Sequence, residues 1–348
     1  MKLLKRLTEA AGVSGREEQV RQIIEAELSG ITDEVSTDAL GNLTAIKRAG
    51  KKNAPKVMVA AHMDEIGFFV RFIDDKGFIR VQQVGGFDPR NLFARQVIVH
   101  ASLSGKELIG VMNPAGKPIH ISTPEERNKV PPLTEFYIDL GMDVERVRSR
   151  VRIGDMVTLR QSFTDLGDVV TGKALDDRVG CWILIEALKR VTKPAFEVHA
   201  MFTVQEEVGL RGAQTGAFRV APDLGIALDT TLAVDTPDIK EHFRVTQLGA
   251  GTALKVMDSS AISTRWLLDE FIALAERQKI NYQLEVLPLG GTDAGAIQKI
   301  REGVPSITIS TPSRYVHTVT EMVSKSDLEG GVRLLSAFLQ EGTARLRS

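Results

Sequence analysis

Two adjacent acids follow an apolar run in the middle of the chain. Residues 198–212 read VHAMFTVQEEVGLRG, in which Glu206 and Glu207 come directly after a strand-like segment and before a glycine-containing turn. Neighbouring side chains on an extended strand point to opposite faces of the sheet. We therefore expect the two glutamates to have different chemical roles.

Other acids and histidines stand where expected strands end or helices begin. The carboxyl ends of neighbouring parallel strands meet at one edge of an α/β sheet, which is where such folds bind ligands. We therefore expect these side chains to converge on one site with Glu206 and Glu207. They are, in chain order, His62 and Asp64 in AAHMDE, Asp176 and Asp177 in ALDDRVG, Asp229 in ALDTT, and His317 in SRYVHT.

Carboxylates gathered at one point repel each other and raise one another's pKa unless a cation lies between them. Three carboxylates and two neutral imidazoles carry about −3, and two divalent ions carry about +4, which leaves a small positive charge that suits a bound hydroxide. Oxygen and nitrogen ligands without thiolate fit Zn²⁺, Co²⁺ or Mn²⁺. The sequence therefore predicts a hydrolase with two divalent metal ions that share a carboxylate.

Composition narrows the class of protein. The chain has 348 residues, of which 43% are hydrophobic and 26% charged, a length that favours two domains. Its formal net charge of −1 gives no basic field for nucleic acid or an anionic membrane. No apolar run reaches the roughly 20 residues of a membrane span. The single cysteine, Cys181, fits a reducing compartment, so we expect a cytoplasmic protein.

Strand and helix patterns alternate in residues 1–67 and 166–348, which predicts an α/β domain whose mostly parallel mixed sheet is sandwiched by helices. Residues 68–165 instead contain short alternating strands separated by turn signals such as DDKG and RIGD. This pattern predicts a small, β-barrel-like domain inserted into the α/β fold. Ser14 and Glu17 in SGREEQV are expected to form a capping box at a helix start.

The ordered motifs resemble those of the glutamyl/deblocking aminopeptidases. These are the tetrahedral aminopeptidases of metallopeptidase family forty-two, some of which have been labelled endoglucanase M. The resemblance covers essentially the whole chain and implies a zinc-peptidase/phosphorylase-like fold. The motifs are AAHMDEIGFFV, GKALDDRVG, TVQEEVGLRGA, ALDTT, GGTDAGAIQ and GVPSITISTPSRYVHT.

The resemblance implies a dinuclear metal-dependent aminopeptidase that removes N-terminal residues from short peptides. Glu206 would be the general base on a metal-bridging water, and Asp64 would orient His62. The peptide between Asp176 and Asp177 is expected to be cis. The implied metal ligands are Asp176 as the bridge, His62 and Asp229 on one ion, and Glu207 and His317 on the other.

The resemblance also implies an assembly, a homo-dodecamer built from dimers through residues 68–165. Three other functions are kept open: a related two-metal amidohydrolase (deacylase or carboxypeptidase), an endoglucanase, and a catalytically silent metal-binding assembly protein. An endoglucanase needs two carboxyl groups flanking a sugar and no metal, and the chain is only 5% aromatic. The same motifs occur with acidic, basic and neutral substrate preferences, and here we expect neutral or aliphatic first residues.

Overall fold

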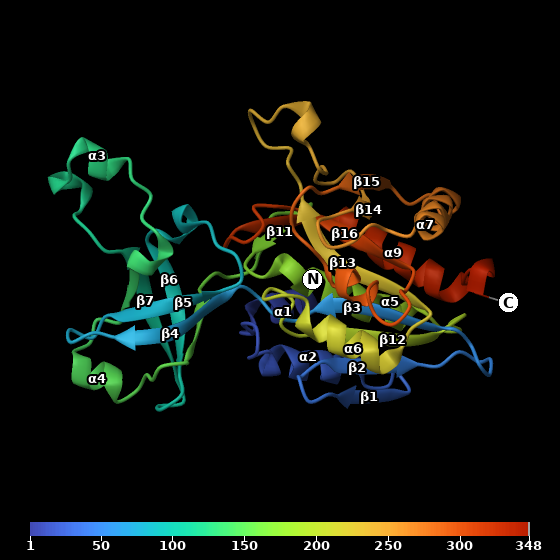
Figure 1. Ribbon diagram of the computed structural model, residues 1–348, viewed down its shortest axis with the longest axis horizontal. Coiled ribbons are helices and arrows are strands. Elements are labelled where there is room, and N and C mark those ends of the chain that lie inside the picture. The colour runs from blue at the N-terminus through green and yellow to red at the C-terminus, as the bar shows by residue number, and fades with distance from the viewer. Residues whose placement is uncertain (347–348) are drawn as a thin grey trace.

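The computed structural model describes residues 1–346, which form a large α/β body and a smaller closed β-barrel. The chain begins in the α/β body, passes through the barrel and returns to the body, as the colours in Figure 1 show. The predicted α/β fold with a mixed sheet and an inserted barrel unit is confirmed.

The α/β body is built on an eleven-stranded sheet that is parallel in its centre and antiparallel toward its edges. Strands β12, β3, β13 and β16 lie side by side in that order, all parallel. The sheet consists of β1 (Glu34–Thr37), β2 (Leu43–Lys47), β3 (Lys56–His62), β10 (Thr164–Asp165), β11 (Val169–Gly172), β12 (Glu197–Thr203), β13 (Leu224–Leu232), β14 (Thr252–Met257), β15 (Tyr282–Val286), β16 (Ser306–Arg314) and β17 (Glu321–Ser324).

Helices cover both faces of this sheet because its central strands are apolar on both sides. In β3, Val57 and Val59 face one core while Met58 and Ala60 face another, as the two-residue repeat of a strand requires. The first core is packed by α1 (Lys2–Glu9), α2 (Glu18–Leu28), α5 (Leu175–Arg190), α7 (Arg265–Arg277) and α9 (Lys325–Glu341), and the second by α6 (Arg211–Val220) and α8 (Asp293–Ile297).

The barrel has six strands with exclusively antiparallel pairing. Its interior is filled by its own apolar side chains, among them Phe68, Val97 and Ile138, so it has a core separate from that of the α/β body. Its strands close in the order β4 (Gly67–Ile73), β5 (Ile79–Val84), β8 (Phe136–Asp139), β7 (Lys106–Pro114), β6 (Arg95–Ala101) and β9 (Met156–Leu159), with short helices α3 (Pro124–Arg127) and α4 (Val144–Arg148) in the connections.

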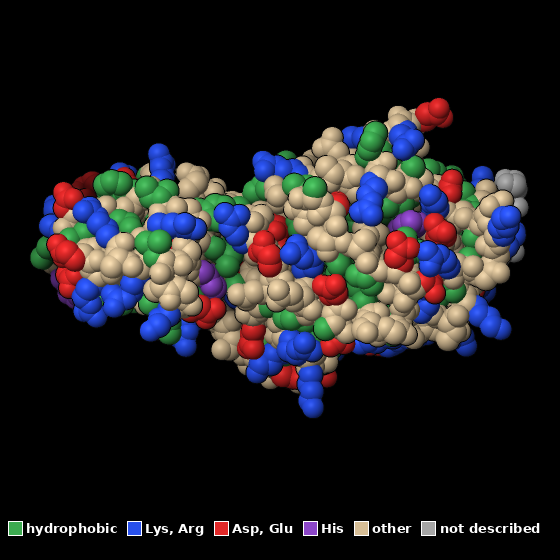
Figure 2. All heavy atoms as spheres, turned by 90° about the horizontal axis from the view of Figure 1, so that it is seen from below, with side chains coloured by type: hydrophobic (Ala, Val, Ile, Leu, Met, Phe, Trp, Pro, Cys, Tyr) green, Lys and Arg blue, Asp and Glu red, His purple; other side chains and the backbone are tan. Residues whose placement is uncertain are grey.

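Positive and negative side chains are mixed over the surface shown in Figure 2, on the barrel and on the α/β body alike. This distribution agrees with the formal net charge of −1 and gives no broad basic face on that side of the molecule. Among residues 1–346, no helix combines the length and the apolar character needed to cross a membrane.

Candidate metal centre

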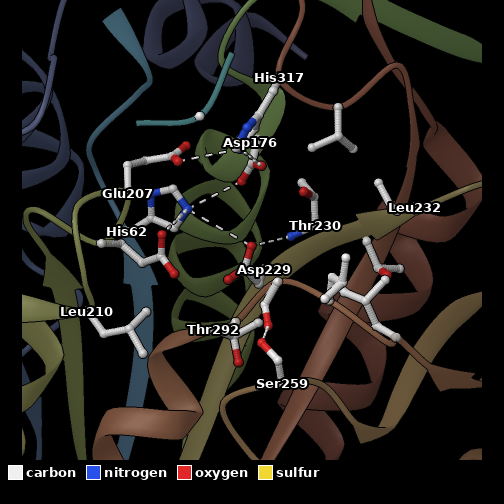
Figure 3. A pocket seen from close by; sticks show the side chains of 18 of the residues that line it. His62, Asp176, Glu207, Leu210, Asp229, Thr230, Leu232, Ser259, Thr292 and His317 are labelled. Atoms are coloured by element: carbon white, nitrogen blue, oxygen red, sulfur yellow. Dashed lines mark hydrogen bonds and ion pairs between the residues drawn. The ribbon is translucent and has the colours of Figure 1, made fainter. Parts of the chain in front are cut away.

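The predicted ligands come together at the carboxyl-terminal edge of the central strands. His62 is the last residue of β3 and Asp229 lies in β13, while Glu207 and His317 follow β12 and β16 closely. Because these strands are parallel and adjacent, their carboxyl ends meet. Asp176 enters from the first turn of α5, and Figure 3 shows the five side chains directed toward one another.

Asp176 lies between the two histidines. Its Oδ1 atom is 3.3 Å from His62 Nε2 and its Oδ2 atom is 3.5 Å from His317 Nε2. Each imidazole also faces a second predicted ligand, since His62 Nε2 is 3.9 Å from Asp229 Oδ1 and His317 Nε2 is 3.4 Å from Glu207 Oε2. The residues thus form two three-membered groups that share Asp176.

Both groups fit a divalent ion. In each of them the candidate ligand atoms lie within 4.8 Å of one another, and the donors are imidazole nitrogens and carboxylate oxygens. Asp176 Oδ1 is buried without a hydrogen-bond partner among residues 1–346. A buried carboxylate oxygen without a partner is costly, and a cation at this point would satisfy it.

The protein's own groups oppose ionisation of most of these acids. Burial, together with neighbouring carboxylates, raises the pKa of Glu206 and Asp229 well above the usual range, and burial also raises the pKa of Glu207. Asp176 is different, because its two histidine partners outweigh its burial and lower its pKa. Likewise, Asp176 and Glu207 overcome burial and raise the pKa of His317 to about 12. Divalent ions would relieve this repulsion.

Asp64 lies beside His62 and also holds the turn that carries the two glutamates. His62 Nδ1 is 3.0 Å from the backbone carbonyl oxygen of Asp64 and 3.5 Å from its carboxylate. That carboxylate also accepts hydrogen bonds from the backbone N–H groups of Glu206 and Glu207, at 3.0 and 3.2 Å. Asp64 therefore fixes the turn that carries both glutamates.

The predicted capping box at Ser14 and Glu17 is wrong. Ser14 Oγ donates to Asp64 Oδ2 at 2.6 Å, and Glu17 Oε1 accepts from the N–H groups of Gly15 and Gln205 at 2.6 and 3.2 Å. Tertiary contacts thus take both side chains away from the helix start. Glu17 and Asp64 accept the three consecutive N–H groups of the Gln205–Glu207 turn, and Ser14 donates to Asp64.

The peptide between Asp176 and Asp177 is cis, as the resemblance implies. The Asp177 carboxylate accepts hydrogen bonds from the N–H groups of His62 at 3.2 Å and Gly180 at 3.0 Å. Asp177 therefore connects the start of α5 to the end of β3 without joining either three-membered group.

Glu321 was not identified from the sequence, although it contacts two of the predicted ligands. It begins β17, is buried, and accepts the backbone N–H groups of Asp176 and His317. The local sequence HTVTEMVS offers no signal for this role, because a lone acid before a short strand is usually solvated.

A cavity of about 580 Å³ opens beside the metal centre and is lined by Glu206 as well as the predicted ligands. The GGTDA turn also lines it through Gly290, Gly291 and Thr292, while Asp293 is buried and accepts a hydrogen bond from Thr203. The remaining wall has one charged side chain, that of Lys255, and is otherwise largely aliphatic and hydroxylic, formed by Leu210, Thr230, Thr231, Leu232, Ser259, Leu287, Leu289 and Val316.

The barrel reaches this cavity through the glycines that follow β5. A side chain at Gly86 would lie 3.4 Å from His317 Nδ1, and one at Gly85 would lie 2.5 Å from Ile66 Cγ2. Gly85 also has φ +82°, which favours glycine. Glycine is thus needed at position 85, and the backbone at both positions lies close to the site.

Comparison with known proteins identifies the family of the chain. The sequence model described as M42 glutamyl aminopeptidase matches residues 41–334. The chain belongs to the M42 aminopeptidase family. A relative from Acetivibrio thermocellus, named provisionally as an aminopeptidase, is 42% identical over 96% of both chains. The lysyl aminopeptidase of Pyrococcus furiosus is 33% identical, over 97% of this chain and 96% of that one.

Solved structures agree with this membership. The TET aminopeptidase of a marine-sediment thaumarchaeon superposes with a TM-score of 0.94 at 35% identity, covering 99% of this chain and 97% of that one. The TET1 peptidase of Pyrococcus horikoshii, which can assemble into a tetrahedron or a large octahedral shell, superposes with a TM-score of 0.87 at 33% identity, covering 98% and 99%. As a member of this family, the chain is a hydrolase of the metal-dependent aminopeptidase class.

The position of Glu17 predicts a pH dependence of stability. Burial, followed by the neighbouring Asp64, raises the pKa of Glu17 from 4.5 to about 7 in the folded protein. Between these values the folded state binds more protons than the unfolded state, so this group lowers the free energy of unfolding as pH rises. Glu17→Gln keeps an acceptor oxygen but does not titrate. We therefore expect its free energy of unfolding to rise, relative to that of wild type, by on the order of 3 kcal/mol between pH 4.5 and pH 8.

Urea unfolding across that pH range, at fixed metal content, measures the difference. Glu18→Gln, at the neighbouring exposed position of α2, is the matched control and should follow the wild-type pH curve. Parallel curves for wild type and Glu17→Gln would contradict the assignment.

Proposed function

We propose that the chain is a two-ion aminopeptidase that removes neutral, preferably aliphatic, N-terminal residues from short peptides. The observation that carries the proposal is the position of Asp176, whose two oxygens face two histidines that each have an acid of their own. Asp176 would bridge the ions, with Zn²⁺ or Co²⁺ favoured and Mn²⁺ also suited to the donors. His62 and Asp229 would hold one ion, and Glu207 and His317 the other.

Glu206 is proposed as the general base. It lines the cavity but belongs to neither three-membered group, and its Oε2 atom is 4.0 Å from His62 Nε2. Its burial and its raised pKa suit a carboxylate that takes a proton from the attacking water and delivers it to the leaving amine. Ions bound beside it would polarise the scissile carbonyl and lower the pKa of water. Asp64 holds the backbone of Glu206 in place for this transfer.

The lining of the cavity supports a preference for uncharged first residues. Leu232, Leu287 and Leu289 contribute apolar surface to it. The buried cation in the lining, Lys255, is already paired, since its Nζ atom is 2.6 Å from Glu285 Oε1 and 3.6 Å from Asp258 Oδ2. A substrate carboxylate would have to compete with both acids for that lysine.

A related two-metal amidohydrolase could use the same ligands, and a solved structure titled endoglucanase, from Thermotoga maritima, is 31% identical to this chain. The acids at this site are better explained as metal ligands than as a pair flanking a sugar, because three of them, Asp176, Asp229 and Glu207, meet two histidines within ion-pair distance. Chelation separates the metal-dependent peptidase from a glycosidase, and cleavage of aminoacyl anilides separates it from a deacylase or a carboxypeptidase. EDTA should abolish cleavage of aminoacyl anilides, whereas a metal-independent glycosidase would keep its activity.

The first prediction for this function contrasts the adjacent glutamates. Glu206→Gln should keep two ions per subunit but lower kcat by about 10²–10⁴, because proton transfer is lost. Glu207→Gln should lose metal as well as activity. Metal content after dialysis and kcat on leucine anilide measure both effects. Near-normal kcat in Glu206→Gln would rule out the general base.

A second prediction concerns the first residue of the substrate. Wild type should have a higher kcat/KM for leucyl than for glutamyl anilide. Glu285→Gln removes one of the two negative charges beside Lys255, so the lysine can attract a substrate carboxylate more strongly. The ratio of kcat/KM for leucyl anilide to that for glutamyl anilide should therefore fall by about tenfold or more, equivalent to about 1.4 kcal/mol. Glu302→Gln, at an exposed position that does not line the cavity, is the control and should keep the wild-type ratio. A wild-type preference for glutamyl anilide contradicts the proposed specificity.

Self-association completes the proposal, with residues 68–165 as the dimerisation unit and a homo-dodecamer as the product. Exposed aliphatic side chains on the barrel unit support this, among them Ile109, Ile119 and Ile121 at 55, 63 and 68% exposure. Light scattering should give a mass of twelve 38.1 kDa subunits, with dimers as the intermediate on dissociation. A stable monomer with full activity and metal content contradicts this. The cytoplasm, suggested by the single buried cysteine, is the proposed location.

A further inference from the structure

One buried carboxylate ties together two segments that carry predicted metal ligands. Glu321 is 2% exposed, and its Oε2 atom accepts the backbone N–H of Asp176 at 3.0 Å. Its Oε1 atom accepts the backbone N–H of His317 at 2.9 Å. We propose that Glu321 is a positioning residue that sets the relative placement of the bridging aspartate and the second-ion histidine. This inference rests on the proposed two-ion site.

The two segments need such a connection because neither is held at this point by regular secondary structure. His317 has φ +62°, a left-handed conformation that non-glycine residues rarely adopt. Asp176 has non-helical dihedral angles at the start of α5, two residues after Ala174, which is also left-handed with φ +56°. A single rigid carboxylate that accepts from both N–H groups fixes their separation and therefore the separation of the side chains.

Glu321 is placed to act through the ligands rather than as one of them. Both of its oxygens are occupied by backbone N–H groups, and neither three-membered group includes it. Partners that orient metal ligands typically contribute a factor of 10–100 to metal affinity. The alternative is that Glu321 only stabilises the fold around β17.

Asp327 provides a matched comparison for that alternative. It is a fully buried acid in α9 whose two oxygens accept the backbone N–H groups of Gly249 and Gly251, at 2.7 and 2.9 Å. Neither glycine is a predicted ligand, and Asp327 does not line the cavity. Glu321 and Asp327 therefore make the same kind of bond, but only Glu321 makes it to residues of the proposed metal centre.

The test compares Glu321→Gln with Asp327→Asn in the full-length protein. Each change replaces one acceptor oxygen by an amide that cannot accept from a backbone N–H, so both variants should lose thermal stability. Only Glu321→Gln should weaken Co²⁺ binding, with the dissociation constant of at least one ion raised about 10–100-fold and the visible spectrum of the bound Co²⁺ altered. Asp327→Asn should bind two Co²⁺ with wild-type affinity and spectrum. Calorimetric titration with Co²⁺ alone and absorption spectroscopy measure these effects.

Glu321→Asp is the second variant if Glu321→Gln does not fold. It keeps the carboxyl group but is one methylene shorter, so it cannot reach both N–H groups, and it should show the same direction of change. Wild-type Co²⁺ affinity in a folded Glu321 variant, or an equal loss in Asp327→Asn, overturns the inference. If wild type itself binds fewer than two ions, the proposed function fails instead, so the two failures are distinguishable.

Discussion

The mutual repulsion of buried carboxylates is the constraint on which the rest of this structure depends. Glu206, Glu207, Asp176 and Asp229 meet two imidazoles at one edge of the sheet, where burial penalises negative charge. Such a cluster is unfavourable unless cations bind among its members. A protein that retains it must therefore combine a strong scaffold with a site that suits divalent ions, and this arrangement agrees with membership of the M42 family.

The scaffold works through backbone N–H groups. Asp64 accepts from Glu206 and Glu207, Asp177 accepts from His62, and Glu321 accepts from Asp176 and His317. In each case an ionised or ionisable acceptor holds the main chain of a site residue while that residue's side chain stays available. Hydrogen bonds to charged acceptors are stronger than neutral ones, which suits loops that regular secondary structure does not restrain.

The inserted barrel is close to the site as well as being a separate packing unit. Its own apolar core makes it independent in packing, yet Gly85 and Gly86 bring its backbone against Ile66, Glu207 and His317. In the proposed assembly through residues 68–165, a change in the contacts of the barrel would therefore alter the wall of the cavity. Because the barrel backbone contacts the site, the proposed assembly and the shape of the cavity would be coupled.

Local patterns in the sequence were enough to predict the α/β alternation, the inserted barrel and the five side chains that converge, because these follow from periodicity and from strand ends in parallel sheets. They did not reveal which side chains hold the site together. Ser14 bonds Asp64 across 50 residues, Glu321 bonds Asp176 across 145, and Glu17 bonds Gln205 across 188. A local pattern assigned Ser14 and Glu17 to a helix cap. Only the tertiary structure, which brings distant N–H groups to buried carboxylates, decided otherwise.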